Sequence, residues 1–328
     1  MGRLEAGKWQ PGWDTSSSGA FERKASAFRD HISREPGARF PPAERRYHLY
    51  VSYACPWAHR TLIVRALRGL EDSIPVTVLS PRMGDHGWQF TEDDPDPLAP
   101  EPIDDLEPPP RYLRDVYLRA KPDMSGKVTV PVLYDLETDN IVSNESREIM
   151  RMFDTEFEVF AKRGPSLAPP HLREQIDAVL DEIYDPINNG VYRAGFATTQ
   201  EAYDVAVEEL FAALGRWDAV LATQRYVTGS ELTEADIALY TTCLRFDLVY
   251  YAHFKCNIRR LADYPHLFGF LRELYQMKEI HEVSRLDHIK EHYYWSQNNV
   301  NPSRIVPKGP TVELDAPHER GLVGGTLP

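Results

Sequence analysis

The sequence predicts two domains of different class, an α/β domain followed by an all-α domain. Over residues 46–160, short aromatic and β-branched runs alternate with amphipathic helical patterns, which is typical of an α/β domain. Over residues 161–295, nearly every segment carries apolar residues at helical spacing. We therefore expect an N-terminal extension at 1–45, the two domains in these ranges, and a Pro/Gly-rich C-terminal tail at 296–328.

The composition favours a globular protein that binds neither nucleic acid nor membrane. With 328 residues, 42% of them hydrophobic, the chain can bury a large core. Its formal net charge of -13 opposes binding to a phosphate backbone. No apolar run reaches the ~18 residues that a membrane span needs, and the first residues lack a signal-peptide pattern. Three cysteines are too few for a disulfide framework, so we expect a cytoplasmic protein.

The α/β domain is expected to begin with a strand, a helix and a second strand. Residues 45–52 and 74–80 have strand composition, and the apolar residues of 57–70 fall on one helical face. The stretch at about 91–110 is rich in proline and acidic residues and has no basic residue, so it predicts a surface insertion.

A third strand, at 128–135, is interrupted by Pro131, and a fourth strand at 140–144 leads into a helix at 145–157. Proline inside a strand removes a ladder hydrogen bond. One remedy is a cis Val130–Pro131 bond, which turns the chain and leaves the backbone of Val130 available to an extended peptide.

Four segments of the second domain have amphipathic helical patterns: 171–187, 200–222, 233–254 and 266–277. Thr233 and Asp236 have the spacing of a capping box at the start of one of them, which is a structural motif.

Cys55 stands where the first strand meets the first helix. Pro56 suits the first turn of a helix, so Cys55 falls at or near the N-cap. There the free N–H groups and the helix dipole favour the thiolate, which is a nucleophile. The fourth position of a Cys-x-x-Cys motif is Ala58, so a disulfide formed on Cys55 needs an external resolving thiol. The alternative is a buried cysteine that only caps the helix. Cys243 and Cys256 lie in helical patterns and are expected to be buried.

Glu145 and Ser146 open the helix that follows the fourth strand. A carboxylate there can receive an α-amino group, and a hydroxyl with helix N–H groups can receive a carboxylate. Alone, the pair also fits an ordinary acidic first turn. Beside Cys55 and Pro131, it favours a binding site.

Three histidines, His281, His288 and His292, share one helical face. "HIKEH" lacks the glutamate that a metalloprotease places after its first histidine, so we favour a solvated face and expect no metal.

Several long motifs carry a family resemblance. They are "YACPWAHR", "TVPVLYD", "IVSNESREIMRMF", "INNGVYRAGFA" and "HIKEHYYWSQNNVNPSRIVPKGP". From about Tyr47 to Pro310, the chain resembles the Xi-class glutathione transferases, the glutathionyl-hydroquinone reductases. The resemblance implies a thioredoxin-like N-terminal domain, an all-α glutathione-transferase C-terminal domain and a homodimer.

The resemblance also implies a reaction. The Cys55 thiolate attacks the glutathione sulfur of a glutathionyl-hydroquinone and releases the hydroquinone. A second glutathione resolves the mixed disulfide, in agreement with the need for an external thiol.

Site residues follow from the same resemblance. The implied glutathione contacts are Trp88, Lys127, the Val130 backbone, Glu145 and Ser146. The implied catalytic residues beside Cys55 are Tyr192, Tyr293 and Tyr294, whose phenol groups suit a flat aromatic substrate. Lys127 stands where the family usually has arginine, and lysine lacks the planar fork that binds a carboxylate in bidentate fashion. Trp295 and Gln297 also depart from the family pattern and bear on substrate preference.

Two other functions stay open. An Omega-like thioltransferase or dehydroascorbate reductase would use the same cysteine and glutathione, but "GVYRAGFA" and "NPSRIVPKGP" oppose it. A non-catalytic interaction module with this fold could dispense with the cysteine, which this chain keeps.

Overall fold

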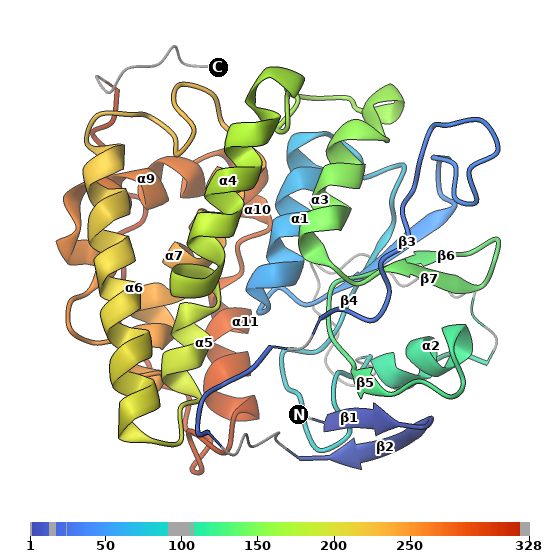
Figure 1. Cartoon of the computed structure of the whole chain (residues 1–328), viewed down its shortest axis with the longest axis horizontal. Coiled ribbons are helices and arrows are strands. Elements are labelled where there is room, and N and C mark those ends of the chain that lie inside the picture. The colour runs from blue at the N-terminus through green and yellow to red at the C-terminus, as the bar shows by residue number, and fades with distance from the viewer. Residues whose placement is uncertain (1, 13–17, 24, 91–105, 107, 322–328) are drawn as a thin grey trace. The chain divides into compact units, whose positions relative to one another are not determined.

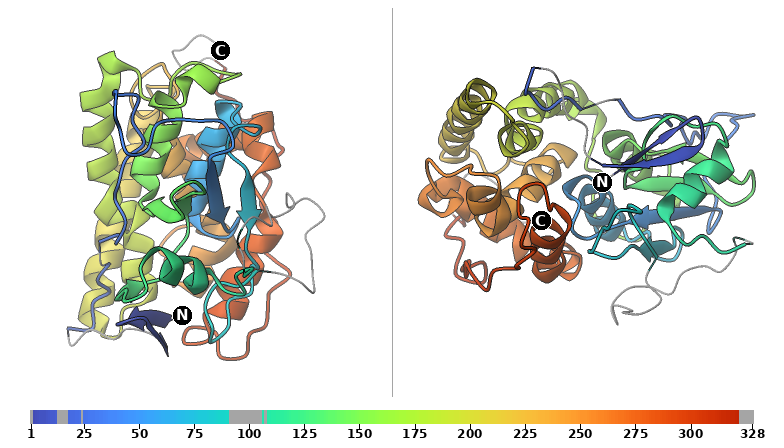
Figure 2. Two further views of the ribbon diagram at one scale, coloured as in Figure 1. Left: turned by 90° about the vertical axis from the view of Figure 1, so that its right-hand side faces the viewer. Right: turned by 90° about the horizontal axis from the view of Figure 1, so that it is seen from below.

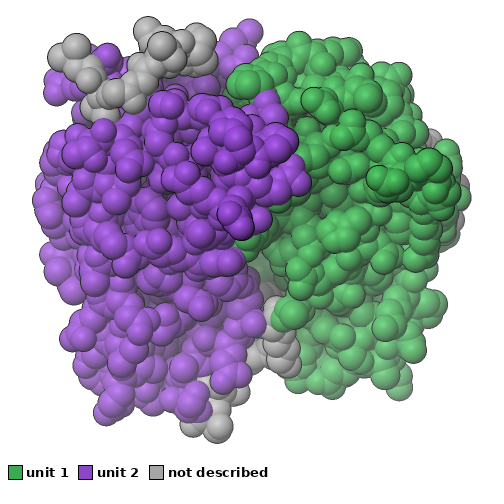
Figure 3. Space-filling view, turned by 45° about the horizontal axis from the view of Figure 1, so that its top comes forward, with its two compact units in different colours: residues 1–14, 24–165, 295–297 green, residues 15–23, 166–294, 298–328 purple. Residues whose placement is uncertain are grey.

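The computed structural model describes residues 2–12, 18–23, 25–90, 106 and 108–321. The chain forms two compact units, which Figure 3 shows in different colours. The first unit consists of residues 1–14, 24–165 and 295–297, and the second of residues 15–23, 166–294 and 298–328. Most of the insertion predicted at about 91–110 lies outside the described residues.

The first unit is built on a four-stranded sheet in the order β4-β3-β6-β7. Its strands are β3 (Tyr47–Val51), β4 (Val76–Val78), β6 (Val132–Asp135) and β7 (Asn140–Ser143). β3 pairs parallel with β4 and antiparallel with β6, and β6 pairs antiparallel with β7. All four strands predicted from the sequence are present, and Pro131 lies just outside β6.

Three helices accompany this sheet. α1 (Pro56–Leu67) and α3 (Ser146–Thr155) contact each other, as Figure 1 shows, and α2 (Leu113–Ala120) contacts β7. The predicted α/β class of the first half is therefore confirmed, and α2 is an element that the sequence patterns did not indicate.

The N-terminal extension contains strands that the sequence patterns did not indicate. β1 (Gly2–Glu5) and β2 (Lys8–Pro11) form a hairpin, and β1 also pairs with β5 (Gly126–Lys127) in a second sheet of order β2-β1-β5. The turn is formed by Ala6 and Gly7, with φ 46 and 76. Alanine is unusual at such a position, where Asn-Gly or Asp-Gly would have been the recognisable pattern.

The second unit is helical, as predicted. Its helices are α4 (Arg173–Ile183), α5 (Gly190–Gly195), α6 (Gln200–Leu221), α7 (Glu234–Arg245), α8 (Tyr251–His253), α9 (Pro265–Tyr275), α10 (Lys278–Glu282) and α11 (Leu286–Glu291). The 22-residue α6 lies beside α5 (Figures 1 and 2). Every residue of α7 is buried, so α7 is central to the core of this unit. The predicted capping box of Thr233 and Asp236 is present at its start.

Within residues 166–321, three π-helical turns interrupt the helical pattern: η3 (Tyr184–Asn188), η4 (Phe246–Tyr250) and η6 (His292–Ser296). Such turns are rare and occur frequently at functional sites, because the extra residue redirects the side chains that follow. The sequence pattern indicated continuous helices through the first two.

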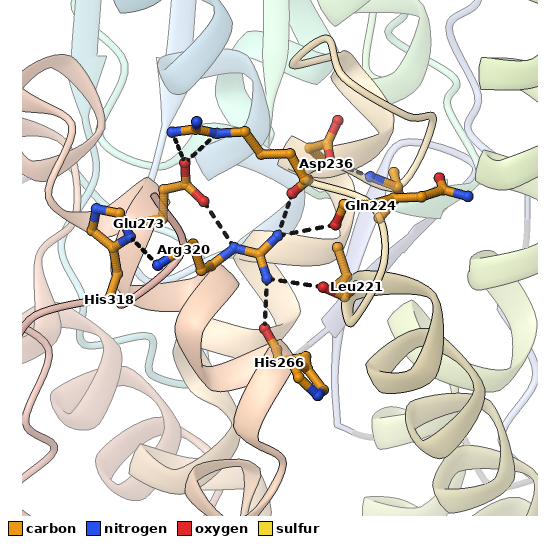
Figure 4. Close-up of polar contacts among 9 residues, drawn as sticks. Leu221, Gln224, Asp236, His266, Glu273, His318 and Arg320 are labelled. Carbon is orange, nitrogen blue, oxygen red and sulfur yellow. Dashed lines mark hydrogen bonds and ion pairs between the residues drawn. The ribbon is translucent and has the colours of Figure 1, made fainter. Parts of the chain in front are cut away.

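Beyond η6, the described part of the C-terminal tail has no helix or strand, yet Arg320 anchors it firmly. The buried Arg320 guanidinium donates to Glu273 Oε2 at 2.8 Å and to backbone carbonyls, among them those of Leu221 and His266 (Figure 4). The other oxygen of Glu273 accepts from Arg225 Nε at 2.7 Å. None of the described helices is both long and apolar enough to cross a membrane.

Candidate active site

The topology of the sheet brings three predicted features to one edge. β3 and β7 both run opposite to β6, so the ends of β3 and β7 and the start of β6 share an edge. Cys55 follows β3, Val130 precedes β6, and Glu145 follows β7. Ligands of such sheets commonly bind at this kind of edge, where helices begin.

Cys55 is the N-cap of α1, as predicted. It has extended backbone angles, φ -78 and ψ 122, and Pro56 is the first helical residue. The thiol is half-buried, and Sγ lies 3.6 Å from the carbonyl oxygen of Val130. Cys55 therefore lies at the positive dipole end of α1, although its side chain makes no capping hydrogen bond.

The Val130–Pro131 bond is cis, as predicted. The last ladder partners of β3 and β6 are Tyr50 and Val132, so Val130 lies beyond the strand pairing. Its carbonyl is directed at Cys55 instead.

A buried tyrosine fixes the residues that precede Val130 and Glu145. Tyr117 Oη donates to the carbonyl of Thr129 at 2.8 Å and accepts from Asn144 Nδ2 at 3.0 Å. Burial raises the pKa of Tyr117, so its hydroxyl stays protonated and can act as that donor.

Glu145 and Ser146 take the predicted positions at the start of α3. Glu145 is the N-cap, and its Oε1 accepts from the backbone N–H of Arg147 at 3.3 Å. Ser146 is only 2% exposed, and among the described residues its hydroxyl has no hydrogen-bond partner. A buried hydroxyl in that state fits a ligand carboxylate, which supplies the missing acceptor.

Trp88 and Lys127 lie in the same unit on other elements. Trp88 is buried, and its carbonyl accepts from the N–H of Leu113, the first residue of α2. Lys127 is half-buried in β5, opposite Arg3 of the N-terminal hairpin. Trp295 belongs to this unit as well, with the guanidinium of Arg82 over its ring at 5.5 Å.

The second unit contains a chain of three tyrosine hydroxyls. Tyr192 Oη lies 2.6 Å from Tyr293 Oη, and Tyr250 Oη lies 3.0 Å from Tyr293 Oη. Both contacts join two phenol groups, and a hydroxyl can donate one hydrogen bond and accept another. Such a chain can deliver a proton to a substrate at one end.

The trio is buried, and this determines its protonation. Burial raises the pKa values of Tyr250 and Tyr293 well above the ordinary tyrosine value. Both phenols are therefore neutral donors at physiological pH. Tyr250 ends η4, Tyr293 lies within η6, and Tyr192 follows η3 by four residues, so each π-helical turn precedes or contains a member of the trio.

Sequence reasoning named Tyr192 and Tyr293 but missed Tyr250. The "LVYY" stretch looks like ordinary helix core, and only the fold brings Tyr250 to Tyr293. The hydroxyl of Tyr294, by contrast, lies 3.5 Å from the carbonyl of Leu248, away from the trio, and its ring packs on His253.

The other two cysteines are buried, as predicted. Cys243 is 1% exposed and Cys256 0%, and burial raises the pKa of each thiol. Cys55 is thus the most accessible thiol in the chain. The described residues contain no group of three or more His, Cys, Asp or Glu side chains that could hold a metal ion.

Comparisons with known proteins identify the family. A model described as the glutathione S-transferase N-terminal domain matches residues 54–156, and one described as the C-terminal domain matches residues 200–273. These matches confirm the predicted thioredoxin-like domain followed by a helical transferase domain.

Three relatives are similar over nearly the whole chain. The glutathionyl-hydroquinone reductase YqjG of Escherichia coli is 49% identical over 330 residues, 98% of this chain and 99% of that protein. Its glutathione-bound structure superposes with a TM-score of 0.87 at 47% identity, covering 98% of this chain and 99% of that one. The glutathionyl-hydroquinone reductase PcpF of Sphingobium chlorophenolicum is 43% identical, covering 96% of this chain and 98% of that protein.

The third is a Xi-class glutathione transferase of Natrialba magadii. Its structure has a TM-score of 0.91 at 51% identity, covering 99% of this chain and 98% of that one. This chain belongs to the Xi-class glutathione transferases, the family of the glutathionyl-hydroquinone reductases.

Proposed function

We propose that the protein uses glutathione to reduce glutathionyl-hydroquinones to hydroquinones. The observation that carries the proposal is the placement of Cys55, half-buried at the N-cap of α1, while Cys243 and Cys256 are buried. With no second accessible cysteine, a disulfide on Cys55 has to be resolved by an external thiol, which glutathione supplies.

The proposed reaction has two balanced steps. The Cys55 thiolate attacks the glutathione sulfur, an S–S bond forms, and the bond between that sulfur and the aromatic carbon breaks. The electron pair stays on the aromatic fragment, which takes up a proton and leaves as hydroquinone. A second glutathione thiolate then attacks the mixed disulfide, which regenerates Cys55 and releases oxidised glutathione.

Glutathione is proposed to bind along the edge of the first unit. The Glu145 carboxylate receives the α-amino group, and the Ser146 hydroxyl receives the neighbouring carboxylate. Val130 pairs with the peptide backbone of glutathione, while Trp88 and Lys127 complete the contacts. The hydroxyl of Ser146, which has no partner among the residues that the structure describes, supports this arrangement.

The tyrosine trio is proposed to stabilise or protonate the aromatic fragment. Negative charge develops on that fragment as the carbon–sulfur bond breaks, so a neutral phenol donor lowers the barrier. Tyr192, Tyr250 and Tyr293 supply the donor chain. Tyr294 is proposed to contribute its ring alone, since its hydroxyl points to Leu248.

Tyr→Phe variants test this function against the Omega-like alternative. Phe keeps the ring and removes the donor, so Tyr192→Phe, Tyr250→Phe and Tyr293→Phe should lower kcat for a glutathionyl-hydroquinone by about ten- to a thousand-fold for the most important of them. Tyr294→Phe is the matched control and should change it little. Reduction of a small mixed disulfide has no aromatic leaving group and should change far less in every variant.

If the variants lose glutathionyl-hydroquinone reduction and mixed-disulfide reduction equally, the role of the trio is structural. Equal retention of both, or faster wild-type turnover of dehydroascorbate than of the hydroquinone conjugate, would favour the thioltransferase. Absence of any turnover would favour the interaction module.

We further propose a cytoplasmic homodimer in which residues 46–160 bind glutathione and residues 161–295 bind the aromatic group. The three cysteines, all free thiols, support a reducing compartment. The dimer follows from the family resemblance and is testable by light scattering.

A further inference from the structure

Residues 26–30 of the N-terminal extension, here called the arm, lie along the outer side of β7. The backbone contacts that fix them are Asp30 N–H to the Val142 carbonyl at 2.9 Å, Asn144 N–H to the Phe28 carbonyl at 3.1 Å, and an antiparallel bridge between Arg29 and Ser143. The arm therefore acts as an additional edge strand next to the segment that leads into Glu145.

Side chains anchor the arm on both sides of Glu145. Asn144 Oδ1 accepts from the N–H of Phe28 at 3.0 Å, while the amide nitrogen of the same side chain donates to Tyr117. On the other side, Arg29 Nε donates to Glu148 at 2.8 Å. These contacts fix the position of the arm relative to the start of α3.

Ser26 contacts Glu145 itself. Its Oγ lies 2.9 Å from Glu145 Oε2 and 3.4 Å from the carbonyl oxygen of Asn144. A hydroxyl has one proton to donate. The Ser26 hydroxyl donates it to Glu145 Oε2, because the charged carboxylate oxygen is both the closer and the stronger acceptor. The opposite oxygen, Oε1, accepts from the N–H of Arg147. Each carboxylate oxygen is therefore held from a different direction.

We propose that Ser26 is a positioning residue of the glutathione site, which presents the Glu145 carboxylate in the orientation that receives the α-amino group of glutathione. This inference rests on the proposed function of Glu145. Without Ser26, the long side chain keeps one anchor at Arg147 and has to lose rotamer freedom when glutathione binds. Pre-organisation of this kind affects binding and leaves the thiol chemistry unchanged.

The first experiment compares Ser26→Ala with the wild type by calorimetric titration with glutathione and by turnover. We expect the dissociation constant and KM for glutathione to rise about tenfold, the scale of one lost hydrogen bond to a charged group. The kcat at saturating glutathione should stay within about twofold, since Cys55 is untouched. Ser26→Thr keeps the hydroxyl and should restore the affinity.

Ser33→Ala is the matched control. It makes the same substitution in the same extension, where the Ser33 hydroxyl accepts from the N–H of Glu35 at 3.2 Å. We expect wild-type affinity and turnover. If Ser26→Ala lowers kcat and the melting temperature together, and Ser26→Thr does not restore the affinity, the role of Ser26 is structural and the inference is overturned.

A second experiment separates this inference from the proposed function. A glutathione analogue without the α-amino group has nothing to place on Glu145, so the wild type and Ser26→Ala should bind it equally. In a Glu145→Ala background, adding Ser26→Ala should cause no further loss of affinity for glutathione.

If Glu145→Ala alone leaves glutathione affinity unchanged, the proposed binding site fails. If Glu145→Ala weakens binding but Ser26→Ala does not, the site stands and only the positioning role of Ser26 is overturned.

Discussion

Among single residues, Cys55 differs from the other two cysteines in where the fold places it. The same thiol group is half-buried at a helix N-terminus in one case and fully buried in Cys243 and Cys256. Burial disfavours the thiolate, whereas N–H groups and the helix dipole favour it. Reactivity should therefore follow position in the fold.

Replacing each cysteine by alanine tests this expectation. Cys55→Ala should abolish reduction of glutathionyl-hydroquinones, because no other accessible thiol can form the mixed disulfide. Cys243→Ala and Cys256→Ala should retain nearly full activity, and mass spectrometry of the glutathione adduct should place it on Cys55 alone. Substantial residual activity in Cys55→Ala would contradict the thiol mechanism.

The residues recognised from sequence were those that lie near a motif. Cys55 before Pro56, and Glu145 beside Ser146, are local patterns whose physical meaning can be derived from helix ends. Tyr250 and Ser26 carry no local pattern, since each acquires its partner only through folding. Their contacts, to Tyr293 and Glu145, join residues far apart in the chain.

Among the elements, those predicted correctly from the sequence are the ones with a clear hydrophobic periodicity. β3, α1, β6 and α7 have clear alternation or helical spacing, and all were predicted. The π-helical turns break the 3.6-residue period of the helices, but their amino-acid composition is that of ordinary helix. The sequence pattern therefore does not predict them. The hairpin of β1 and β2 was missed because its strands are short and polar and its turn is atypical.

The β1–β2 hairpin pairs with β5, the strand that carries Lys127. A substitution at Gly7, in the turn of the hairpin, can disturb that pairing. A Cβ at Gly7 would lie 2.2 Å from the carbonyl oxygen of Pro122, and the N–H of Gly7 donates to Met124 at 2.9 Å. Gly7→Ala should displace the hairpin at a cost of about 1–3 kcal/mol. The melting temperature should fall, and KM for glutathione should rise several-fold through Lys127.

Gly12→Ala is the matched control for this prediction. Gly12 also has a positive φ, +121, but nothing lies within 4 Å of a Cβ built there. Both variants therefore carry backbone strain, and only Gly7→Ala adds a clash. Equal effects of both on KM would mean that the contact with Pro122 is irrelevant to Lys127.

At the scale of the whole chain, the described residues near each end make contacts that the sequence did not reveal. The N-terminus supplies strands to a sheet of the first unit, and the C-terminal tail supplies Arg320 to the core of the second. The Pro and Gly content predicted an irregular tail, and residues 297–321, the described part beyond η6, have no helix or strand. Side-chain contacts hold it in place of secondary structure: Arg320 is buried, and Gln276 donates to the carbonyls of Leu314 and Ala316.

Arg320→Ala should therefore destabilise the protein more than any surface charge substitution. Glu273 is 6% exposed and lies between Arg320 and Arg225, so the variant leaves a buried carboxylate with one of its two cations. The loss of one partner from a buried ion pair costs about 3–5 kcal/mol. Four backbone carbonyls, those of Leu221, Gln224, Arg225 and His266, would also lose their shared donor.

Urea unfolding of the purified protein measures this change. Arg216→Ala is the control, because Arg216 and Glu182 form an exposed pair at 2.7 Å whose removal should cost at most about 1 kcal/mol. Arg320→Lys keeps the charge but cannot reach the carboxylate and the carbonyls together, so it should fall between the wild type and Arg320→Ala. If Arg320→Ala and Arg216→Ala unfold at the same urea concentration, the tail does not stabilise the core, and the contacts of Arg320 are incidental to folding.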